Sequence, residues 1–259
     1  MNRKKVLISG ATHGIGLEIA KILAKNNFDI AFFSRSKKKV ESTKKILKKF
    51  KIKVYGEQVD ALNLSDLEFF FKKMEKEFGD INILVNNVGG GGSWGNDLIE
   101  KTNYEVWSEV HTKNVGAAIK LITLCVPKMK KNKWGRIITI ASISAKKGVG
   151  RPWYVLSKKA EVVLTKTLSV KRDLIRNGIT FNSVSPGAIM IPDTGWDNRR
   201  KENPKKFKKL VDDKFPMGRL GKPQEIASIF PFLCSEQSRF INGADICIDG
   251  GQSNEEYED

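Results

Sequence analysis

A strand, a glycine-rich turn and a helix open the chain, and this order constrains the fold more than any other feature. Residues 5–9 form a short apolar run, residues 10–16 follow the pattern Gly-x-x-x-Gly-x-Gly, and residues 17–25 place apolar side chains at helical spacing. A phosphate-binding loop requires this context, because such glycines permit a tight turn and let the helix N-terminus approach a pyrophosphate. Three glycines also occur in ordinary turns, so a turn without a ligand is the alternative interpretation.

The rest of the chain continues the alternation. Further strands are expected at residues 29–34, 53–56, 81–86, 136–141, 179–184 and 246–248. Helices are expected at residues 38–50, 65–78 (with Ser65 as N-cap and Glu68 completing a capping box), 103–129, 151–166 and 223–233. Such an alternation predicts a parallel, doubly wound α/β sheet of about seven strands flanked by helices. Because no linker-like segment or repeat is found, residues 1–259 are predicted to form a single Rossmann-type domain.

Composition argues against several classes of protein. Hydrophobic residues make up 40% of the 259 residues, but no apolar run approaches the length of about 18 residues that a membrane span needs. The N-terminal apolar run is too short for a signal peptide. Cys125, Cys234 and Cys247 are far apart, so neither a disulfide framework nor a metal site is expected. These features predict a cytoplasmic protein that does not associate with membranes.

The formal net charge of +17 raises the question of a nucleic-acid partner, because phosphates attract such a charge. However, lysine greatly outnumbers arginine, the lysines are spread over many segments, and residues 255–259 are mostly acidic. We therefore expect no nucleic-acid partner. An anionic cofactor or substrate would also benefit from this charge.

The end of the second predicted strand favours NADP(H) over NAD(H). In dinucleotide-binding folds an acidic residue near this position holds the adenosine ribose, whereas an arginine suits a 2′-phosphate. Ser34, Arg35 and Ser36 stand there without an acidic residue, and His13 in the glycine turn offers a further donor. The alternative is that Arg35 is an ordinary solvated charge and that NAD(H) is used.

Tyr154 and Lys158 form a candidate acid–base pair. They are four residues apart in a predicted helix, so they lie on one face, one turn from each other. A free tyrosine ionises near about pH 10, and a neighbouring ammonium favours the phenolate, which makes proton exchange easier at neutral pH. In a chain this rich in lysine the same spacing also arises by chance, as a buried tyrosine beside a solvated lysine.

Several further candidates directly follow predicted strands. They are the glycine turn, Arg35, Asp60, Asn86, Ser142 and Pro186. Since ligands of open α/β sheets bind at the carboxyl ends of the strands, these residues are expected to form one composite site.

Together these motifs resemble the short-chain dehydrogenase/reductase family over nearly the whole chain. Residues 9–16 resemble its cofactor loop, with Ser9 where threonine is usual, and residues 86–89 resemble its Asn-Asn-Ala-Gly motif, with Val88 in place of alanine. Residues 218–227 and 249–251 resemble the end of 3-oxoacyl-acyl-carrier-protein-reductase-like members. The family's catalytic tetrad is matched by Asn114, Ser142, Tyr154 and Lys158.

The resemblance implies a role for each of these residues. Tyr154 would exchange a proton with the substrate oxygen, while Lys158 would assist Tyr154 and hold the nicotinamide ribose. Ser142 would hydrogen-bond the substrate oxygen, and Asn114 would anchor a water molecule in a proton relay. Besides Tyr154 and Lys158, the implied cofactor site contains Gly10, Thr12, His13, Gly14, Ile15, Gly16, Ser34, Arg35, Ser36, Asp60, Ala61, Asn87, Gly89, Pro186, Gly187 and Ile189.

The family pattern is broken at one position and is least informative about the substrate. Ile191 stands where a threonine often holds the nicotinamide amide, so the Ile189 backbone or Thr194 would replace it. Residues 190–216 are expected to form a lid, whose basic residues belong either to a solvated helix or to a site for an anionic or carrier-linked substrate. Candidate substrate contacts are Trp94 in the glycine-rich residues 89–95, Ser144, Arg151, Trp153, Met190 and Trp196.

We therefore predict an NAD(P)(H)-dependent oxidoreductase that interconverts a ketone and a secondary alcohol by hydride transfer. A 3-oxoacyl thioester is the most specific substrate expected, and a sugar, polyol or other small alcohol is the alternative. A nucleotide-binding sensor without turnover is the more distant alternative, although such a protein has no need of Tyr154 and Lys158 together. Family analogy implies a homo-oligomer, either a dimer or a tetramer.

Overall fold

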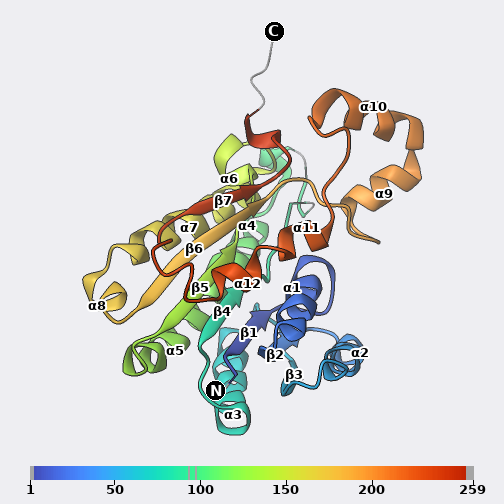
Figure 1. Cartoon of the computed structure of the whole chain (residues 1–259). Coiled ribbons are helices and arrows are strands. Elements are labelled where there is room, and N and C mark those ends of the chain that lie inside the picture. Colours follow the sequence, from blue (N-terminus) through green and yellow to red (C-terminus); the bar gives the residue numbers. More distant parts are fainter. Residues whose placement is uncertain (1–2, 93, 97, 255–259) are drawn as a thin grey trace.

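The computed structural model describes residues 3–92, 94–96 and 98–254. The acidic residues 255–259 and Ser93 of the glycine-rich segment lie outside the described residues. A seven-stranded parallel sheet forms the centre, in the order β3-β2-β1-β4-β5-β6-β7 (Figure 1). Its strands are β1 (Lys5–Ser9), β2 (Asp29–Ser34), β3 (Val54–Gln58), β4 (Ile83–Asn86), β5 (Gly135–Ile140), β6 (Ile179–Pro186) and β7 (Asp245–Ile248). The predicted doubly wound α/β sheet is confirmed.

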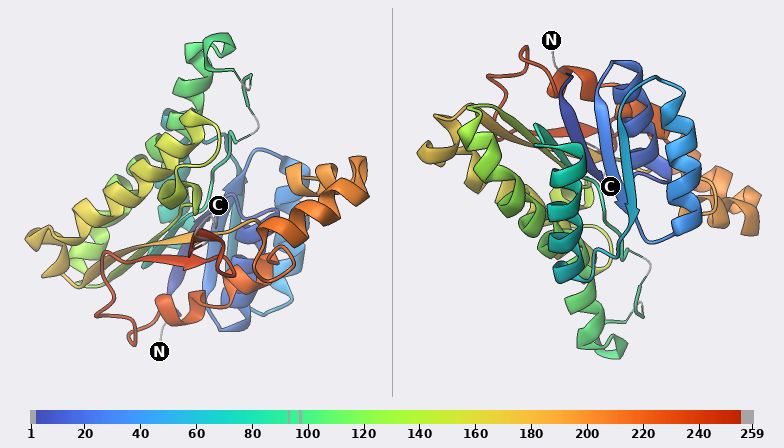
Figure 2. Two further views of the ribbon diagram at one scale, coloured as in Figure 1. Left: turned by 90° about the horizontal axis from the view of Figure 1, so that it is seen from above. Right: turned by 90° about the horizontal axis from the view of Figure 1, so that it is seen from below.

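Helices cover both faces of the sheet, which therefore separates two apolar cores (Figure 2). Helices α1 (Gly14–Lys25) and α2 (Lys37–Lys48) lie on one face, and α3 (Leu64–Phe78), α5 (Ala117–Lys131) and α7 (Pro152–Ser169) lie on the other. Successive side chains of a strand point to opposite faces. Val6 and Ile8 accordingly belong to the core under α1, while Leu7 belongs to the core that contains Phe70 of α3. Burial on both faces explains why the strands are almost continuously apolar.

The segment expected to form a lid lies at the carboxyl-end side of the sheet. It consists of α9 (Gly195–Glu202) and α10 (Pro204–Lys214), which project from the body at the upper right of Figure 1. Phe207, Val211, Phe215 and Leu220 form a small core of their own, against which Trp196 packs. Pro204 occupies the first turn of α10, and Asn203 caps it by accepting a hydrogen bond from the Lys206 N–H at 2.9 Å.

The helix expected at residues 103–129 is interrupted. It divides into α4 (Tyr104–His111), the π-helical segment η2 (Thr112–Gly116) and α5. A π-helical turn inserts one extra residue and often occurs at functional sites. Here it contains Asn114, whose side chain is bonded to the loop after β4 rather than directed to solvent.

Two further local predictions were wrong. The helix expected at residues 223–233 divides into α11 (Pro223–Ala227) and α12 (Phe230–Leu233), because Pro231 has no N–H with which to continue the helical hydrogen bonds. Helix α3 begins at Leu64 and is capped by Asn63, not by Ser65. The Asn63 side chain accepts hydrogen bonds from the backbone N–H groups of Ser65 and Asp66 at 3.1 and 3.2 Å.

Short helical elements complete the fold. They are η1 (Ile99–Lys101), α6 (Ser144–Lys147), α8 (Arg172–Ile175) and η3 (Gln252–Asn254). No helix in the described part of the chain is long and apolar enough to cross a membrane.

Candidate active site

A cavity of about 1370 Å³ lies at the carboxyl ends of the strands. The segments after β1 to β6 line it, and the lid contributes further residues. The structure thus brings most of the predicted site residues together. Those in the lining are Gly10, Thr12, His13, Gly14, Ile15, Ser34, Arg35, Ser36, Asp60, Ala61, Asn87, Gly89, Ser142, Ser144, Arg151, Tyr154, Lys158, Pro186, Gly187, Ile189 and Trp196.

The glycine turn has the geometry of a phosphate cradle. Gly10 adopts a φ of 71° and Gly14 one of 55°, values that favour glycine. Helix α1 then begins at Gly14 against the cavity, and its N-cap residue His13 makes no side-chain capping bond. The first-turn amides are therefore open to an anion, which the positive end of the helix dipole also favours. Gly16 does not line the cavity, but a Cβ there would lie 2.6 Å from the Gly10 carbonyl oxygen, so glycine is needed for close packing.

Ser9 joins the glycine turn to the loop that follows β4. Its buried hydroxyl accepts hydrogen bonds from the backbone N–H groups of Asn87 at 2.8 Å and Val88 at 2.9 Å. The Asn87 side chain in return donates to the carbonyl oxygens of Ser9 at 2.9 Å and Gly10 at 3.1 Å. Two walls of the cavity are thereby held at a fixed separation.

Cations dominate the charge of the lining. At the end of β2, Thr12 donates a hydrogen bond to the Ser34 hydroxyl at 2.8 Å, and Ser36 caps α2 by accepting from the Lys39 N–H at 3.4 Å. Arg35 is exposed between these two serines. Among the described residues of the lining, Asp60 is the single acidic one, and the basic ones besides His13 are Arg35, Lys39, Lys113, Lys147, Arg151, Lys158, Arg199 and Lys214.

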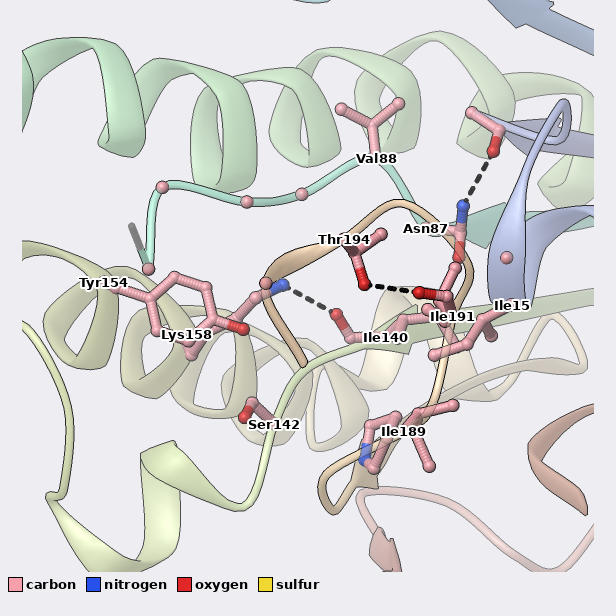
Figure 3. A pocket seen from close by; sticks show the side chains of 18 of the residues that line it. Ile15, Asn87, Val88, Ile140, Ser142, Tyr154, Lys158, Ile189, Ile191 and Thr194 are labelled. Atoms are coloured by element: carbon pink, nitrogen blue, oxygen red, sulfur yellow. Dashed lines mark hydrogen bonds between the residues drawn. The ribbon is translucent and has the colours of Figure 1, made fainter. Parts of the chain in front are cut away.

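Tyr154 and Lys158 lie on the wall opposite the glycine turn, together with Ser142 (Figure 3). The Lys158 Nζ lies 5.9 Å from the centroid of the Tyr154 ring. Lys158 is buried and donates hydrogen bonds to the Ile140 carbonyl oxygen and to Glu161, both at 2.9 Å. It is therefore not the solvated lysine that the chance interpretation of the spacing requires.

Asn114 lies behind this wall rather than in it. Its Oδ1 accepts a hydrogen bond from the Gly90 N–H at 3.0 Å, and its Nδ2 donates to the Gly90 carbonyl oxygen at 3.1 Å and to the Ser157 hydroxyl at 2.7 Å. The side chain thus joins the loop after β4 to α7. Both ends of its amide have protein partners, so the expected water-anchoring role stays a prediction.

The comparisons with known proteins agree with this geometry. A family model described as enoyl-(acyl carrier protein) reductase matches residues 10–253. The 3-oxoacyl-(acyl-carrier-protein) reductase of Staphylococcus aureus is 29% identical over 250 residues, which cover 96% of this chain and 97% of that protein. The chain belongs to the short-chain dehydrogenase/reductase family. The prediction of an oxidoreductase that acts on CH–OH and C=O groups is thereby confirmed.

Two solved structures of this family cover nearly all of the chain. L-sorbose reductase from Gluconobacter frateurii, complexed with NADPH and L-sorbose, has a TM-score of 0.90 and 30% identity and covers 99% of this chain and 98% of that one. YwfH, an NADPH-dependent reductase involved in bacilysin biosynthesis, has a TM-score of 0.87 and 28% identity and covers 97% of this chain and 98% of that one.

The departure from the family at Ile191 alters the wall beside the glycine turn. The Ile191 side chain packs against Gly14, where an added Cβ would lie 3.0 Å from its Cδ1. Thr194 also lines the cavity, but its hydroxyl donates to the Ile191 carbonyl oxygen at 2.7 Å. Within the described residues the Ile189 backbone N–H has no hydrogen-bond partner, so of the two expected replacements it is the one left open to a ligand.

Three of the expected substrate contacts do not line the cavity. Trp153 is 2% exposed, and its ring N–H donates to the Gly91 carbonyl oxygen at 3.2 Å. The ring of Trp94 stacks on Lys113, whose Nζ lies 4.4 Å from the ring centroid. Met190 packs against the lid core. Adjacent residues of a helix do not share a face, so Trp153 is directed away from the cavity that Tyr154 lines.

Arg151 does line the cavity, but it also holds the glycine-rich loop. Its Nη1 donates to the carbonyl oxygens of Trp94 and of Gly95, the latter at 2.6 Å. The loop is thus held by Arg151, the N-cap residue of α7, and by the ring N–H of Trp153.

Sequence reasoning did not single out Lys113 or Glu161. Lys113 lines the cavity because the π-helical segment presents it there, and burial together with repulsion from Arg35 lowers the pKa of its ammonium. Its position next to Asn114 was the available signal. Glu161 is three residues after Lys158, a spacing that places both on one helix face.

In the described part of the chain, no cluster of three or more His, Cys, Asp or Glu residues is arranged to hold a metal ion.

Proposed function

We propose that the protein is an NADP(H)-preferring oxidoreductase that interconverts a ketone and a secondary alcohol. The observation that supports this most is the position of Tyr154, Lys158 and Ser142 on one wall of a cavity whose other wall carries the uncapped N-terminus of α1. A nucleotide-binding sensor would not need a tyrosine and a buried lysine at that place. The NADPH bound or used by the two structural relatives supports the same cofactor here.

The residues of the cavity divide the work of binding among themselves. The first-turn amides of α1 would bind the pyrophosphate, and Arg35 with Lys39 would bind the 2′-phosphate. Pro186, Gly187 and the Ile189 N–H would contact the nicotinamide. NADP(H), when bound, supplies or accepts the hydride, whereas the protein orients and polarises the substrate.

Proton transfer is the chemistry that this chain contributes. The Tyr154 phenol would donate a proton to the carbonyl oxygen during reduction and accept it from the alcohol during oxidation. Ser142 would hold that oxygen by a hydrogen bond, and the Lys158 ammonium would orient the phenol and the nicotinamide ribose. A 10²- to 10⁴-fold contribution is typical of such general acid–base catalysis, about 3 to 5 kcal/mol of barrier.

We further propose that the substrate carries negative charge, as a carrier-linked 3-oxoacyl thioester does. The support is the basic lining near Tyr154 and on the lid, where Arg151, Lys147, Arg199 and Lys214 face the cavity. The likeness to the Staphylococcus aureus enzyme points to the same substrate class. A sugar or polyol is the second candidate, because L-sorbose reductase is the structural relative with a TM-score of 0.90.

The remaining expectations concern the state of the protein. We propose one domain over residues 1–259, a cytoplasmic location, and a homo-oligomer formed through α5 and α7. The apolar side chains of Ile119, Leu156 and Val163 are exposed on these helices and support the last point. Light scattering of the purified protein measures its molar mass and tests this proposal. A monomer at micromolar concentration would contradict the homo-oligomer.

The first experiment is a fluorescence titration with NADPH and with NADH at fixed salt concentration. Tighter binding of NADPH that is lost in Arg35→Asp supports the proposal, whereas equal or tighter binding of NADH in the wild type contradicts the cofactor assignment. NADPH oxidation is then followed with acetoacetyl thioester and with L-sorbose as probes. Tyr154→Phe is expected to abolish turnover while cofactor affinity stays nearly the same, and full activity of that variant would refute the mechanism.

A further inference from the structure

Glu161 is a buried carboxylate that the proposed mechanism does not use. Its side chain is 1% exposed and lies on α7, outside the cavity lining. The Oε2 atom accepts the hydrogen bond from Lys158 at 2.9 Å, whereas Oε1 has no hydrogen-bond partner. The Thr165 hydroxyl donates to the backbone carbonyl of Glu161, not to its carboxylate. Among the described residues, Lys158 is therefore the partner of this carboxylate.

Stability alone does not account for a glutamate at this position. Burying a charge costs free energy that a single ion pair does not reliably recover, and apolar residues of similar volume are often neutral or stabilising in its place. The unpartnered Oε1 adds to this cost. The contact with Lys158, whose ammonium reaches the cavity wall, instead links Glu161 to the reaction.

The charges around Lys158 make Glu161 its principal counter-ion. Charged or titratable residues of the elements that pack against α7 are Tyr104, Glu105, Glu109 and His111 of α4, Lys113 of η2, Arg136 of β5, Lys146 and Lys147 of α6, and Arg172 and Asp173 of α8. Strand β6 contains none. Of these, Lys113 acts on Lys158, by repulsion. Glu161 and the Tyr154 phenol face Lys158 from its own helix.

The protonation of the pair follows from these contacts. Burial lowers the pKa of the Lys158 ammonium, but Glu161 and Tyr154 outweigh burial, so that the pKa lies above its ordinary value. Burial raises the pKa of the Glu161 carboxyl above its ordinary value, and Lys158 opposes that rise without cancelling it. The 2.9 Å contact between the Lys158 Nζ and the Glu161 Oε2 is that of an ion pair, and the carboxylate makes this ammonium stabilise a phenolate at Tyr154 less than an unpaired ammonium would.

We propose that Glu161 is a positioning residue that holds the Lys158 ammonium at the cavity wall and raises the pH at which the Tyr154–Lys158 pair loses its first proton. This inference rests on the proposed oxidoreductase function. A negative charge beside the pair makes its first proton harder to remove, whichever of the two groups loses it. The phenol thus keeps the proton that ketone reduction consumes. Alcohol oxidation, which needs that proton removed first, is displaced to higher pH.

The test compares the wild type with Glu161→Gln and with Glu161→Met, which resembles glutamate in length but carries no charge. Glu41→Gln is the matched control, because Glu41 and Lys44 also form a 2.9 Å pair at a spacing of three residues, but on the exposed side of α2. Two readouts are recorded against pH: oxidation of a 3-hydroxyacyl thioester and of sorbitol with NADP⁺, and the near-ultraviolet absorbance of tyrosinate. For each protein, the absorbance of the same protein with Tyr154→Phe added is subtracted. The difference reports the ionisation of the Tyr154 phenol alone and needs no substrate.

In Glu161→Gln and Glu161→Met both curves are expected to move to lower pH by about 1 unit, while Glu41→Gln follows the wild type. Coincidence of the Glu161 variants with the wild type in both readouts overturns the proposal. Loss of folding in both variants, judged by circular dichroism, also overturns it, because the carboxylate would then serve stability. A wild type that oxidises neither probe and binds no NADPH contradicts the proposed function instead, and the absorbance titration still decides the role of Glu161.

Discussion

Replacing Ser9 with alanine should destabilise the protein by removing one oxygen that serves two backbone amides. Ser9 is 2% exposed, and its hydroxyl accepts from the N–H groups of Asn87 and Val88 at 2.8 and 2.9 Å. Each buried amide left without an acceptor costs about 1 to 3 kcal/mol. Because both amides lie beside the cavity and water reaches them in part, we expect a loss of about 2 to 4 kcal/mol in the free energy of unfolding.

The assay is thermal unfolding by circular dichroism, with Ser9→Thr as the control that keeps the hydroxyl. For a chain of this size, the loss in Ser9→Ala corresponds to a Tm lowered by about 5 to 15 °C. Ser9→Thr should stay near the wild type, because it retains the acceptor. NADPH affinity of Ser9→Ala should also fall, since the loop from Asn87 to Gly90 lines the cavity. A Tm of Ser9→Ala within about 2 °C of the wild type would refute the reasoning.

Three further predictions concern the glycine turn, the lid and the cofactor site. Gly16→Ala should lower the free energy of unfolding in urea by about 1 to 3 kcal/mol, because the new Cβ would meet the Gly10 carbonyl oxygen. Gly195→Ala is the control and should leave it unchanged, because a Cβ at Gly195 meets nothing within 4 Å. Lys201, the Asp193 N–H and Arg200 hold the pKa of the Asp197 carboxyl well below its ordinary value. The ionised carboxylate therefore stabilises the folded lid at every pH above about 4, the pKa of an aspartate in the unfolded chain. This stabilisation is lost as the pH falls from there through the lower pKa of the folded state. Proteolysis of the lid should therefore accelerate in acid, and Asp197→Asn should abolish that pH dependence. Lys113→Met should weaken NADPH binding about tenfold and make the affinity less dependent on salt concentration. An unchanged affinity would exclude a contact between Lys113 and the cofactor phosphates.

The elements that position the site were predictable because their signals are local. The apolar run of residues 5–9 and the glycine turn needed no information from elsewhere in the chain, and β1 and β2 begin and end at the predicted residues. The one-turn spacing of Tyr154 and Lys158 is likewise a local signal, although the motifs at the strand ends were needed to distinguish it from chance. The predictions were wrong where a local feature interrupts a helix. Pro231 divides the helix predicted at residues 223–233, and the π-helical segment interrupts the helix predicted at residues 103–129.

The walls of the substrate site were less predictable because they depend on contacts distant in sequence. Trp94 was expected to face the cavity, yet its ring stacks on Lys113, a residue nineteen positions later on another element. Met190 belongs to the lid core, which only the packing of α10 reveals. By contrast, the same helical rule that found Lys158 from Tyr154 also places Trp153 on a different face and Glu161 beside Lys158, so these two assignments were within reach of the sequence.

The distribution of charge gives Glu161 a reason within the whole site. A cavity that binds a phosphate-rich cofactor needs cations, and here Arg35, Lys39 and Lys113 line it with Asp60 as the acidic residue. A nearby cation in general stabilises an ionised phenol. Ketone reduction requires the opposite form, a phenol that still carries its proton. A carboxylate behind Lys158 resolves this conflict, since it offsets the charge nearest to Tyr154 while it stays outside the lining and does not repel the cofactor phosphates. Substitution of Glu161 should therefore change the protonation of Tyr154 most, and the affinity for NADPH only through the Lys158 ammonium that would hold the nicotinamide ribose.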